Sequence, residues 1–154
     1  MPHINEKYDF VISVFIVHDN KVLLVNHPRY NKWIPMGGHI ELDEDPDEAL
    51  FREIEEETGL DVEILSPRLS MQEVGVKFCY TPMHLEVHEA NATHKHIALI
   101  YYGKSKTDKY VLSDEHTGIG WVDLEELESP KYNLSESDKF YCREAIKESN
   151  LYIS

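Results

Sequence analysis

Three glutamates, Glu53, Glu56 and Glu57, are the residues of this sequence best placed to do chemistry. If the segment around them is helical, offsets of three and four residues put the three carboxylates on one face of the helix. Carboxylates gathered in this way repel one another, so a helix without a function gains nothing from them. Mg²⁺, in contrast, prefers carboxylate and water oxygens and usually binds beside substrate phosphates. Taken alone, the three glutamates leave two interpretations open, a metal-dependent enzyme acting on phosphates and a solvated acidic face.

The residues on both sides of the glutamates predict the helix that must position them. Asp45 is a suitable N-cap, Pro46 fits the first helical position, and Glu48, three residues after Asp45, completes a capping box. Gly59 suits the left-handed conformation that ends a helix. The sequence therefore predicts a helix that begins at residue 46 and ends at residue 59.

This helix is predicted to be amphipathic. At about 100° per residue, Leu50, Phe51 and Ile54 form an apolar arc beside the acidic one. Ala49 falls within the acidic arc, where its small side chain would leave room for a metal ion and water. The three glutamates lie in the later turns, where the helix dipole does not favour negative charge, so their position supports a functional interpretation.

The wider pattern around the glutamates resembles the Nudix box, the signature of the Nudix hydrolase family. Seven positions matched at about 5% each coincide by chance on the order of once in a billion windows, so the resemblance is specific. One departure is local: Met36 stands directly before the paired glycines, where the family commonly has a proline, and Pro35 is displaced by one position. The residues at the seven fixed positions are Gly38, Glu44, Arg52, Glu53, Glu56, Glu57 and Gly59.

The resemblance implies a set of catalytic and metal-binding residues. Nudix enzymes hydrolyse nucleoside diphosphates that are linked to another moiety, and their box binds Mg²⁺ or Mn²⁺. By resemblance, Glu53, Glu56 and Glu57 would be metal ligands, joined by a carbonyl at Gly38. Arg52 would pair with a box carboxylate and hold it in place. The resemblance thus implies Mg²⁺ or Mn²⁺ as the cofactor and assigns Arg52 and the three glutamates to catalysis.

The general base stays open at this stage. Metal ions would neutralise the diphosphate, lower the pKa of bound water and align its attack on phosphorus. A carboxylate must then accept a proton from that water. Glu53 could do so while contacting metal, and so could a loop acid such as Glu115.

The sequence also suggests residues that would contact the substrate. His94 and His96 alternate along a predicted strand, and an aromatic residue near the box, such as Trp33, could stack on a base. No histidine spacing matches a zinc signature, so hydrogen-bonded surface or pocket residues are favoured over a dedicated histidine metal site. The predicted substrate-binding residues are Arg29, Trp33, Gly37, Gly38, His94 and His96.

Composition predicts one globular domain over residues 1–154, with a net charge of −14. That charge argues against nucleic-acid polymers and anionic membranes as main partners and favours a small nucleotide or diphosphate substrate. The sequence has no apolar run of about 18 residues, and its start lacks signal-peptide character. Two cysteines are too few for a disulfide framework, so we expect a cytoplasmic protein with buried thiols. The sequence leaves open whether the protein forms a homodimer.

Strands mixed with two or three helices predict an α/β protein, and the resemblance implies a Nudix-type α/β/α sandwich with a mixed β-sheet. Periodicity alone would predict only α/β or α+β. Residues 81–93 are expected to be rich in loop, with a short strand near residues 84–88. Ser135 is expected to cap a C-terminal helix, after a small helix at residues 124–127. The other predicted strands are residues 10–17, 21–26, 62–65, 69–74, 97–102 and 120–122.

Three functions are compatible with these residues. The first is hydrolysis of a phosphoanhydride bond in a nucleoside diphosphate derivative or a nucleoside triphosphate. The second is a non-catalytic nucleotide-binding Nudix module, although such modules typically lose box carboxylates and this sequence has lost none. The third is an enzyme like isopentenyl diphosphate isomerase, which needs a catalytic cysteine; Cys79 is the only candidate near the middle of the chain. The substrate itself is left open.

Overall fold

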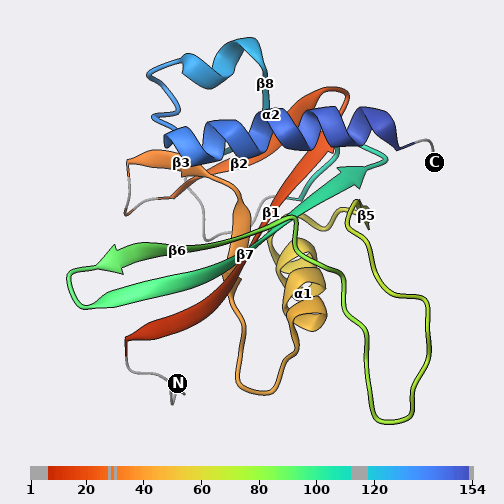
Figure 1. Cartoon of the computed structure of the whole chain (residues 1–154). Coiled ribbons are helices and arrows are strands. Elements are labelled where there is room, and N and C mark those ends of the chain that lie inside the picture. The colour runs from red at the N-terminus through yellow and green to blue at the C-terminus, as the bar shows by residue number, and fades with distance from the viewer. Residues whose placement is uncertain (1–6, 28, 30, 112–117, 153–154) are drawn as a thin grey trace.

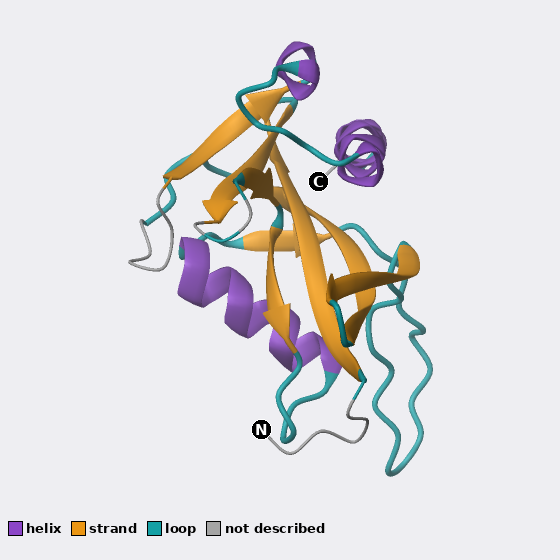
Figure 2. Cartoon of the chain, turned by 90° about the vertical axis from the view of Figure 1, so that its left-hand side faces the viewer, coloured by secondary structure: helices purple, strands orange, loops and turns teal. Residues whose placement is uncertain are grey.

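The computed structural model describes residues 7–27, 29, 31–111 and 118–152. Within them, eight strands form one mixed sheet, and two α-helices lie on its opposite sides, as Figure 2 shows. The predicted α/β/α sandwich is therefore confirmed. Neither helix combines the length and the apolar character that crossing a bilayer requires, among the residues described.

The sheet is built around two long strands that run parallel at its centre, β1 and β7 (Figure 1). The main path runs in the order β3-β2-β1-β7-β5, while β4 also pairs with β1, β6 with β7 and β8 with β2. Each of these pairs except β1–β7 is antiparallel. The strands are β1 (Tyr8–His18), β2 (Lys21–His27), β3 (Lys32–Ile34), β4 (Met36–His39), β5 (Val62–Ile64), β6 (His84–Asn91), β7 (His94–Ser105) and β8 (Gly118–Asp123).

The core has two parts, one on each face of the sheet, and β1 contributes to both. Successive side chains of a strand point to opposite faces, so a strand covered on both sides is apolar nearly throughout. Residues 12, 14 and 16 pack in the cluster that includes Ala49, Leu50 and Ile54 of α1 (Pro46–Thr58). Residues 11, 15 and 17 pack in the cluster that includes Cys142 and Ala145 of α2 (Glu136–Leu151). The continuous apolar run predicted this double burial.

The helix carrying the glutamates forms as the sequence predicts. The Asp45 side chain accepts from the backbone N–H of Glu48, and the Glu48 side chain accepts from the backbone N–H of Asp45, which completes the capping box. Gly59 ends the helix with φ +66°. The prediction that Ala49 lies beside the metal is wrong, because Ala49 is fully buried in the core and leaves no room there for metal or water. Phe51, predicted in the apolar arc, is 43% exposed.

Two segments differ from the predicted elements. Residues 69–74 do not form a strand; Glu73 makes only an isolated bridge with Val76, which lies beyond the segment. Residues 84–91 form the strand β6, which makes a hairpin with β7 and extends beyond the short strand expected near residues 84–88. Leu85 and Val87 of β6 are exposed, so the strand lacks the buried alternation by which a strand is recognised.

The other predicted elements are confirmed within a few residues. The short helix is η1 (Glu125–Glu128), of 3-10 type, and Ser135 caps α2 by accepting from the backbone N–H of Asp138. The short strands β3 and β4, which were not predicted, lie on either side of Pro35. Met36, which stands where the family commonly has a proline, is fully buried opposite Val14 of β1.

Candidate active site

The acidic face of α1 lies against β4, so the glutamates meet the paired glycines that precede them in the sequence. The backbone N–H of Gly37 donates to Glu57 Oε1 over 3.0 Å. Glu57 is 4% exposed, and the side chains of Glu53 and Glu56 are 13% and 60% exposed. The three carboxylates therefore run from the protein interior to the surface.

Arg52 is the cation at the centre of this acidic face. Its Nε and Nη2 donate to the two oxygens of Glu44 over 2.5 and 2.9 Å, and Nη2 also donates to the carbonyl of His39 over 3.1 Å. Its Nη1 donates to Glu53 Oε1 over 2.9 Å and to Glu56 Oε2 over 3.2 Å. The bond from Arg52 lowers the pKa of Glu44, and Glu44 in turn raises the pKa of Arg52. The planar guanidinium fork therefore fixes three box carboxylates, those of Glu44, Glu53 and Glu56.

Among the carboxyl groups on this face of α1, that of Glu53 has the most strongly shifted pKa. Its burial, followed by its hydrogen bond with Glu57 and the charge of Glu57, raises its pKa to about 8, against the opposing effect of Arg52. Burial and the neighbouring carboxylate of Glu57 thus disfavour ionisation of Glu53, and a bound cation would offset both effects.

Glycine is required at positions 37 and 38 because neighbouring atoms lie very close to both Cα atoms. A Cβ atom on Gly38 would lie 2.3 Å from Glu53 Oε1, and one on Gly37 would lie 2.1 Å from the carbonyl oxygen of Ile12. Any side chain at these positions would displace Glu53 or separate β4 from β1. The backbone of the loop therefore approaches the carboxylates as only glycine allows.

This donor set fits a hard divalent cation such as Mg²⁺. The carboxylates of Glu53, Glu56 and Glu57 and the backbone of Gly38 offer the oxygen ligands that such an ion prefers. The carboxylates are not gathered as tightly as in a closed metal site. In the described part of the chain, three donor atoms come within 4.8 Å of one another only at Asp9, His39 and His96.

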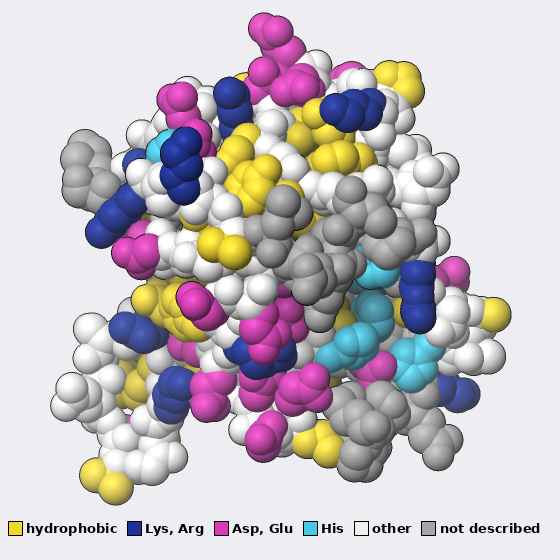
Figure 3. Space-filling view, turned by 180° about the vertical axis from the view of Figure 1, so that it is seen from behind, with side chains coloured by type: hydrophobic (Ala, Val, Ile, Leu, Met, Phe, Trp, Pro, Cys, Tyr) yellow, Lys and Arg dark blue, Asp and Glu magenta, His cyan; other side chains and the backbone are white. Residues whose placement is uncertain are grey.

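A cavity of about 550 Å³ opens beside the box, and the paired glycines form part of its wall. The other walls come from β1, β3, β6, β7 and the N-terminal end of α2, including Lys32, Glu86 and Asp138. Burial raises the pKa of Asp138 to about 6. Figure 3 shows acidic side chains and histidines side by side on this face of the molecule. The box and the cavity therefore share one border, the segment Gly37–Gly38.

The predicted substrate-binding residues fall into two groups. Gly37, Gly38 and His96 line the cavity, whereas His94 does not; its Nε2 contacts the carboxylate of Asp9, the residue paired with His96 in the sheet. Arg29 is exposed outside the lining residues, and its backbone N–H donates to His27. Trp33 packs edge-on against Tyr132, with ring centroids 5.1 Å apart. Glu115, the alternative base, lies outside the described residues.

Four residues near the cavity were not singled out from the sequence for this role: Asp9, His39, Glu86 and His88. His88 Nε2 lies 3.2 Å from His96 Nδ1, and His39 Nε2 lies 3.6 Å from Asp9 Oδ2. Burial, followed by the charges of His88 and His39, lowers the pKa of His96. The position of His39 directly after the paired glycines was the one signal in the sequence that could have placed it at the site.

Comparison with solved structures places this architecture among known enzymes. A hydrolase of the NUDIX family from Clostridium perfringens superposes with a TM-score of 0.79 at 32% identity, covering 90% of this chain and 96% of that one. The MutT protein of Methanosarcina mazei Go1 gives a TM-score of 0.65 at 22% identity, over 96% and 99% of the two chains. The similarity to the Methanosarcina mazei protein, at 22% identity, supports the shared fold alone. The similarity to the Clostridium perfringens hydrolase, at 32% identity, also supports common ancestry.

Comparison of sequences agrees with that of structures. The "MutT-like protein" of Streptomyces ambofaciens is 27% identical over 117 residues, which are 76% of this chain and 64% of that protein. The "NAD-capped RNA hydrolase NudC" of Vibrio atlanticus is 40% identical over 53 residues, 33% of this chain and 20% of that protein. The match thus spans less than two thirds of each curated relative. Residues 7–143 match the model of the NUDIX domain, and this chain is therefore a member of the Nudix hydrolase family.

Proposed function

We propose that this Nudix hydrolase uses Mg²⁺ or Mn²⁺ to cleave a phosphoanhydride bond in a nucleoside diphosphate derivative or a nucleoside triphosphate, by attack of water at phosphorus. One observation carries the proposal: the complete set of box carboxylates converges on Arg52 and the paired glycines, at the border of a cavity of about 550 Å³. A cavity of this size suits a small-molecule ligand.

The metal would be held by Glu53, Glu56 and Glu57, with the carbonyl of Gly38. When bound, it would neutralise the diphosphate and lower the pKa of the attacking water. Arg52 holds Glu53 and Glu56 in position, and the N–H of Gly37 does the same for Glu57. We assign proton acceptance to Glu53, because it is the buried box carboxylate whose proton affinity the surroundings raise most clearly.

The cavity would receive the remainder of the substrate. Its wall combines the Lys32 ammonium, the Asp138 carboxyl and the imidazole of His96. The pKa of Asp138 is about 6, so this group can donate or accept a hydrogen bond near neutral pH. We propose that these groups contact the nucleoside or the distal group, with Arg29 contributing positive charge at the rim.

The isomerase interpretation has little support in the structure. Cys79 does not line the cavity, and burial together with the charges of Asp47 and Asp45 raises the pKa of its thiol. A thiolate is therefore disfavoured there. Both cysteines are free thiols, which is consistent with our proposal of a cytoplasmic protein. That the protein forms a homodimer remains a prediction.

The test is a turnover screen of the purified protein against a panel of nucleoside triphosphates, dinucleotide polyphosphates, nucleotide sugars and ADP-ribose. Each compound is assayed with Mg²⁺, with Mn²⁺ and with EDTA, and phosphate and nucleotide products are followed. We expect metal-dependent cleavage of one compound class. Tight nucleotide binding without cleavage under every metal condition would instead support the non-catalytic module.

A further inference from the structure

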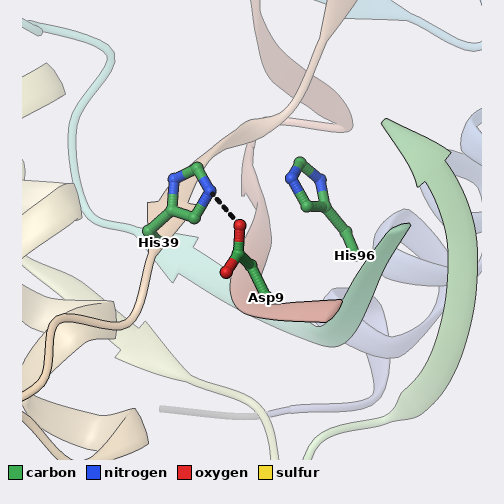
Figure 4. Close-up of side chains that lie close together, drawn as sticks. All are labelled: Asp9, His39 and His96. Carbon is green, nitrogen blue, oxygen red and sulfur yellow. Dashed lines mark ion pairs between the residues drawn. The ribbon is translucent and has the colours of Figure 1, made fainter. Parts of the chain in front are cut away.

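We propose that Asp9, His39 and His96 form a second cation site, separate from the Nudix box, for a divalent first-row transition ion such as Zn²⁺. One donor atom from each of the three residues lies within 4.8 Å of the other two. Figure 4 shows the three side chains turned toward one shared space. The site rests on residues other than the box carboxylates, so it does not depend on the proposed hydrolysis.

Strand register brings the three residues together. Asp9 of β1 is paired directly with His96 of β7, and His39 at the end of β4 is paired with Val11 of β1. The donors therefore stand on three adjacent strands, whose spacing the sheet hydrogen bonds hold constant. Such a site is largely preformed, because no loop has to move for the donors to meet.

The distances suit a tetrahedral ion. Two ligands held about 2.0–2.2 Å from such an ion lie roughly 3.3–3.6 Å apart. His39 Nε2 and Asp9 Oδ2 are already 3.6 Å apart. The rings of His39 and His96 have centroids 5.2 Å apart at an interplanar angle of 89°. The three donor atoms lie within 4.8 Å of one another and would have to close to the roughly 3.3–3.6 Å separation of two ligands, and His39 is the exposed member of the set.

The hydrogen bonds around His96 give it the tautomer that a metal ligand needs. His88 Nδ1 lies 2.9 Å from Glu86 Oε2, so a neutral His88 donates from Nδ1 to this carboxylate and accepts at Nε2. His96 Nδ1, 3.2 Å from His88 Nε2, is then the donor. The lone pair of His96 therefore resides on Nε2. Carboxylate-to-histidine chains of this kind orient metal-binding imidazoles and increase their basicity.

Asp9 has comparable support. Its side chain is 7% exposed, and Oδ2 contacts Nε2 of His94, the histidine predicted to act near the substrate. An N–H of His94 directed at the carboxylate fixes its orientation, as partners of metal-binding carboxylates commonly do. His94 is thus a positioning residue in this proposal.

The donor set distinguishes the ion from Mg²⁺. Imidazole nitrogens suit Zn²⁺, Fe²⁺ and Co²⁺, whereas Mg²⁺ takes oxygen ligands. Two histidines and one carboxylate leave at least one coordination position open, as in catalytic zinc sites. His39 and His96 line the cavity, so the open position would face a ligand bound there. An oxygen-rich group on that ligand is the chemistry that such an ion recognises.

The test measures metal binding directly. The protein is first saturated with Mg²⁺ to occupy the box, and Zn²⁺ is then titrated by calorimetry, with Co²⁺ as an optically visible substitute. We expect one additional equivalent of Zn²⁺, and a visible Co²⁺ spectrum typical of low coordination number. His39→Gln and His96→Gln should each weaken Zn²⁺ binding at least about 10-fold.

Two controls separate this site from its alternatives. His18→Gln changes a histidine at the other end of β1, which contacts the carbonyl of Ser105, and should bind Zn²⁺ as the parent protein does. Glu56→Gln should lose affinity for Mg²⁺ and keep the Zn²⁺ site. The proposal is overturned if no additional Zn²⁺ binds, if His39→Gln and His96→Gln bind it unchanged, or if Glu56→Gln abolishes it. Circular dichroism confirms the fold of each variant.

Discussion

Two clusters of potential metal ligands meet at Gly37–Gly38, and they are built differently. The box draws its three carboxylates from one helix, at spacings of three and four residues. The histidine cluster draws Asp9, His39 and His96 from three strands, at positions that only sheet register relates. One cluster is thus assembled by local geometry and the other by tertiary pairing.

The two clusters also solve the problem of charge differently. In the box, burial and like charge raise the pKa of Glu53 to about 8, and Arg52 supplies a resident cation. In the histidine cluster, burial lowers the pKa of His96 and so disfavours the charged ring, while Asp9 supplies one carboxylate. The difference predicts a hard ion at the box and a nitrogen-seeking ion beside it.

The largest effect is expected from the box carboxylates. Glu57→Gln should lower kcat/KM by about 10³-fold, because it removes a buried charge that would bind the metal and that the N–H of Gly37 orients. Glu55 is an exposed neighbour on the same helix, so Glu55→Gln is the matched control and should retain parental turnover. Steady-state kinetics with Mg²⁺ measures both. Equal activity of the two variants would contradict the assignment of Glu57.

The next largest effect concerns the close approach of the glycine loop. Gly38→Ala places a Cβ atom 2.3 Å from Glu53 Oε1, so the carboxylate must move. A displacement of this size is expected to lower kcat by on the order of 10²-fold. Gly118→Ala is the control, since its Cβ atom would have its nearest neighbour at 3.4 Å. Full activity of Gly38→Ala would show that the position of Glu53 is not critical.

A third prediction uses the pH dependence of stability without metal. The pKa of Glu53 is higher in the folded than in the unfolded protein, so its protonated form stabilises the fold. This contribution is present in full below the ordinary carboxyl range and is lost as pH rises through about 8. In EDTA, the free energy of unfolding should therefore fall by on the order of 2 kcal/mol as the pH rises from the ordinary carboxyl range to above about 8.

Denaturant titrations of the parent and of Glu53→Gln at several pH values measure this effect. The variant should show a flatter profile, and it should be the more stable protein at pH 8 without metal. Added Mg²⁺ should stabilise the parent and leave the variant nearly unchanged. A parent profile as flat as that of the variant would show that Glu53 ionises normally.

The smallest effect is expected for Arg29, which is exposed and lies outside the residues that line the cavity. Arg29→Ala should raise KM by a few fold at low salt and leave kcat unchanged, because an exposed charge outside the cavity acts through screened electrostatics. The difference should shrink as ionic strength rises. Lys109→Ala removes another exposed cation and is the control. A fall in kcat for Arg29→Ala would place its guanidinium at the reacting phosphate.

Much of the fold could be predicted from particular residues. The capping box at Asp45 and Glu48 and the glycine at position 59 defined α1, because these signals are local. The apolar run of β1 predicted burial on both faces for a similar reason. Only a short strand near residues 84–88 was predicted for β6, because Leu85 and Val87 are exposed; the full strand forms by pairing with β7. Ala49 was misplaced because the sheet covers the side of the helix on which it lies.

The sequence by itself determined that this is a Nudix protein and which carboxylates form the box, since the motif is contiguous and its spacing matches the turn of a helix. Only the tertiary structure decided which residues share the cavity. Asp9 and His39 are thirty positions apart and His96 lies far beyond both, so no periodicity relates them. They meet because β1 pairs with β4 on one side and with β7 on the other, and hydrogen-bonded strand register is a property of the folded sheet.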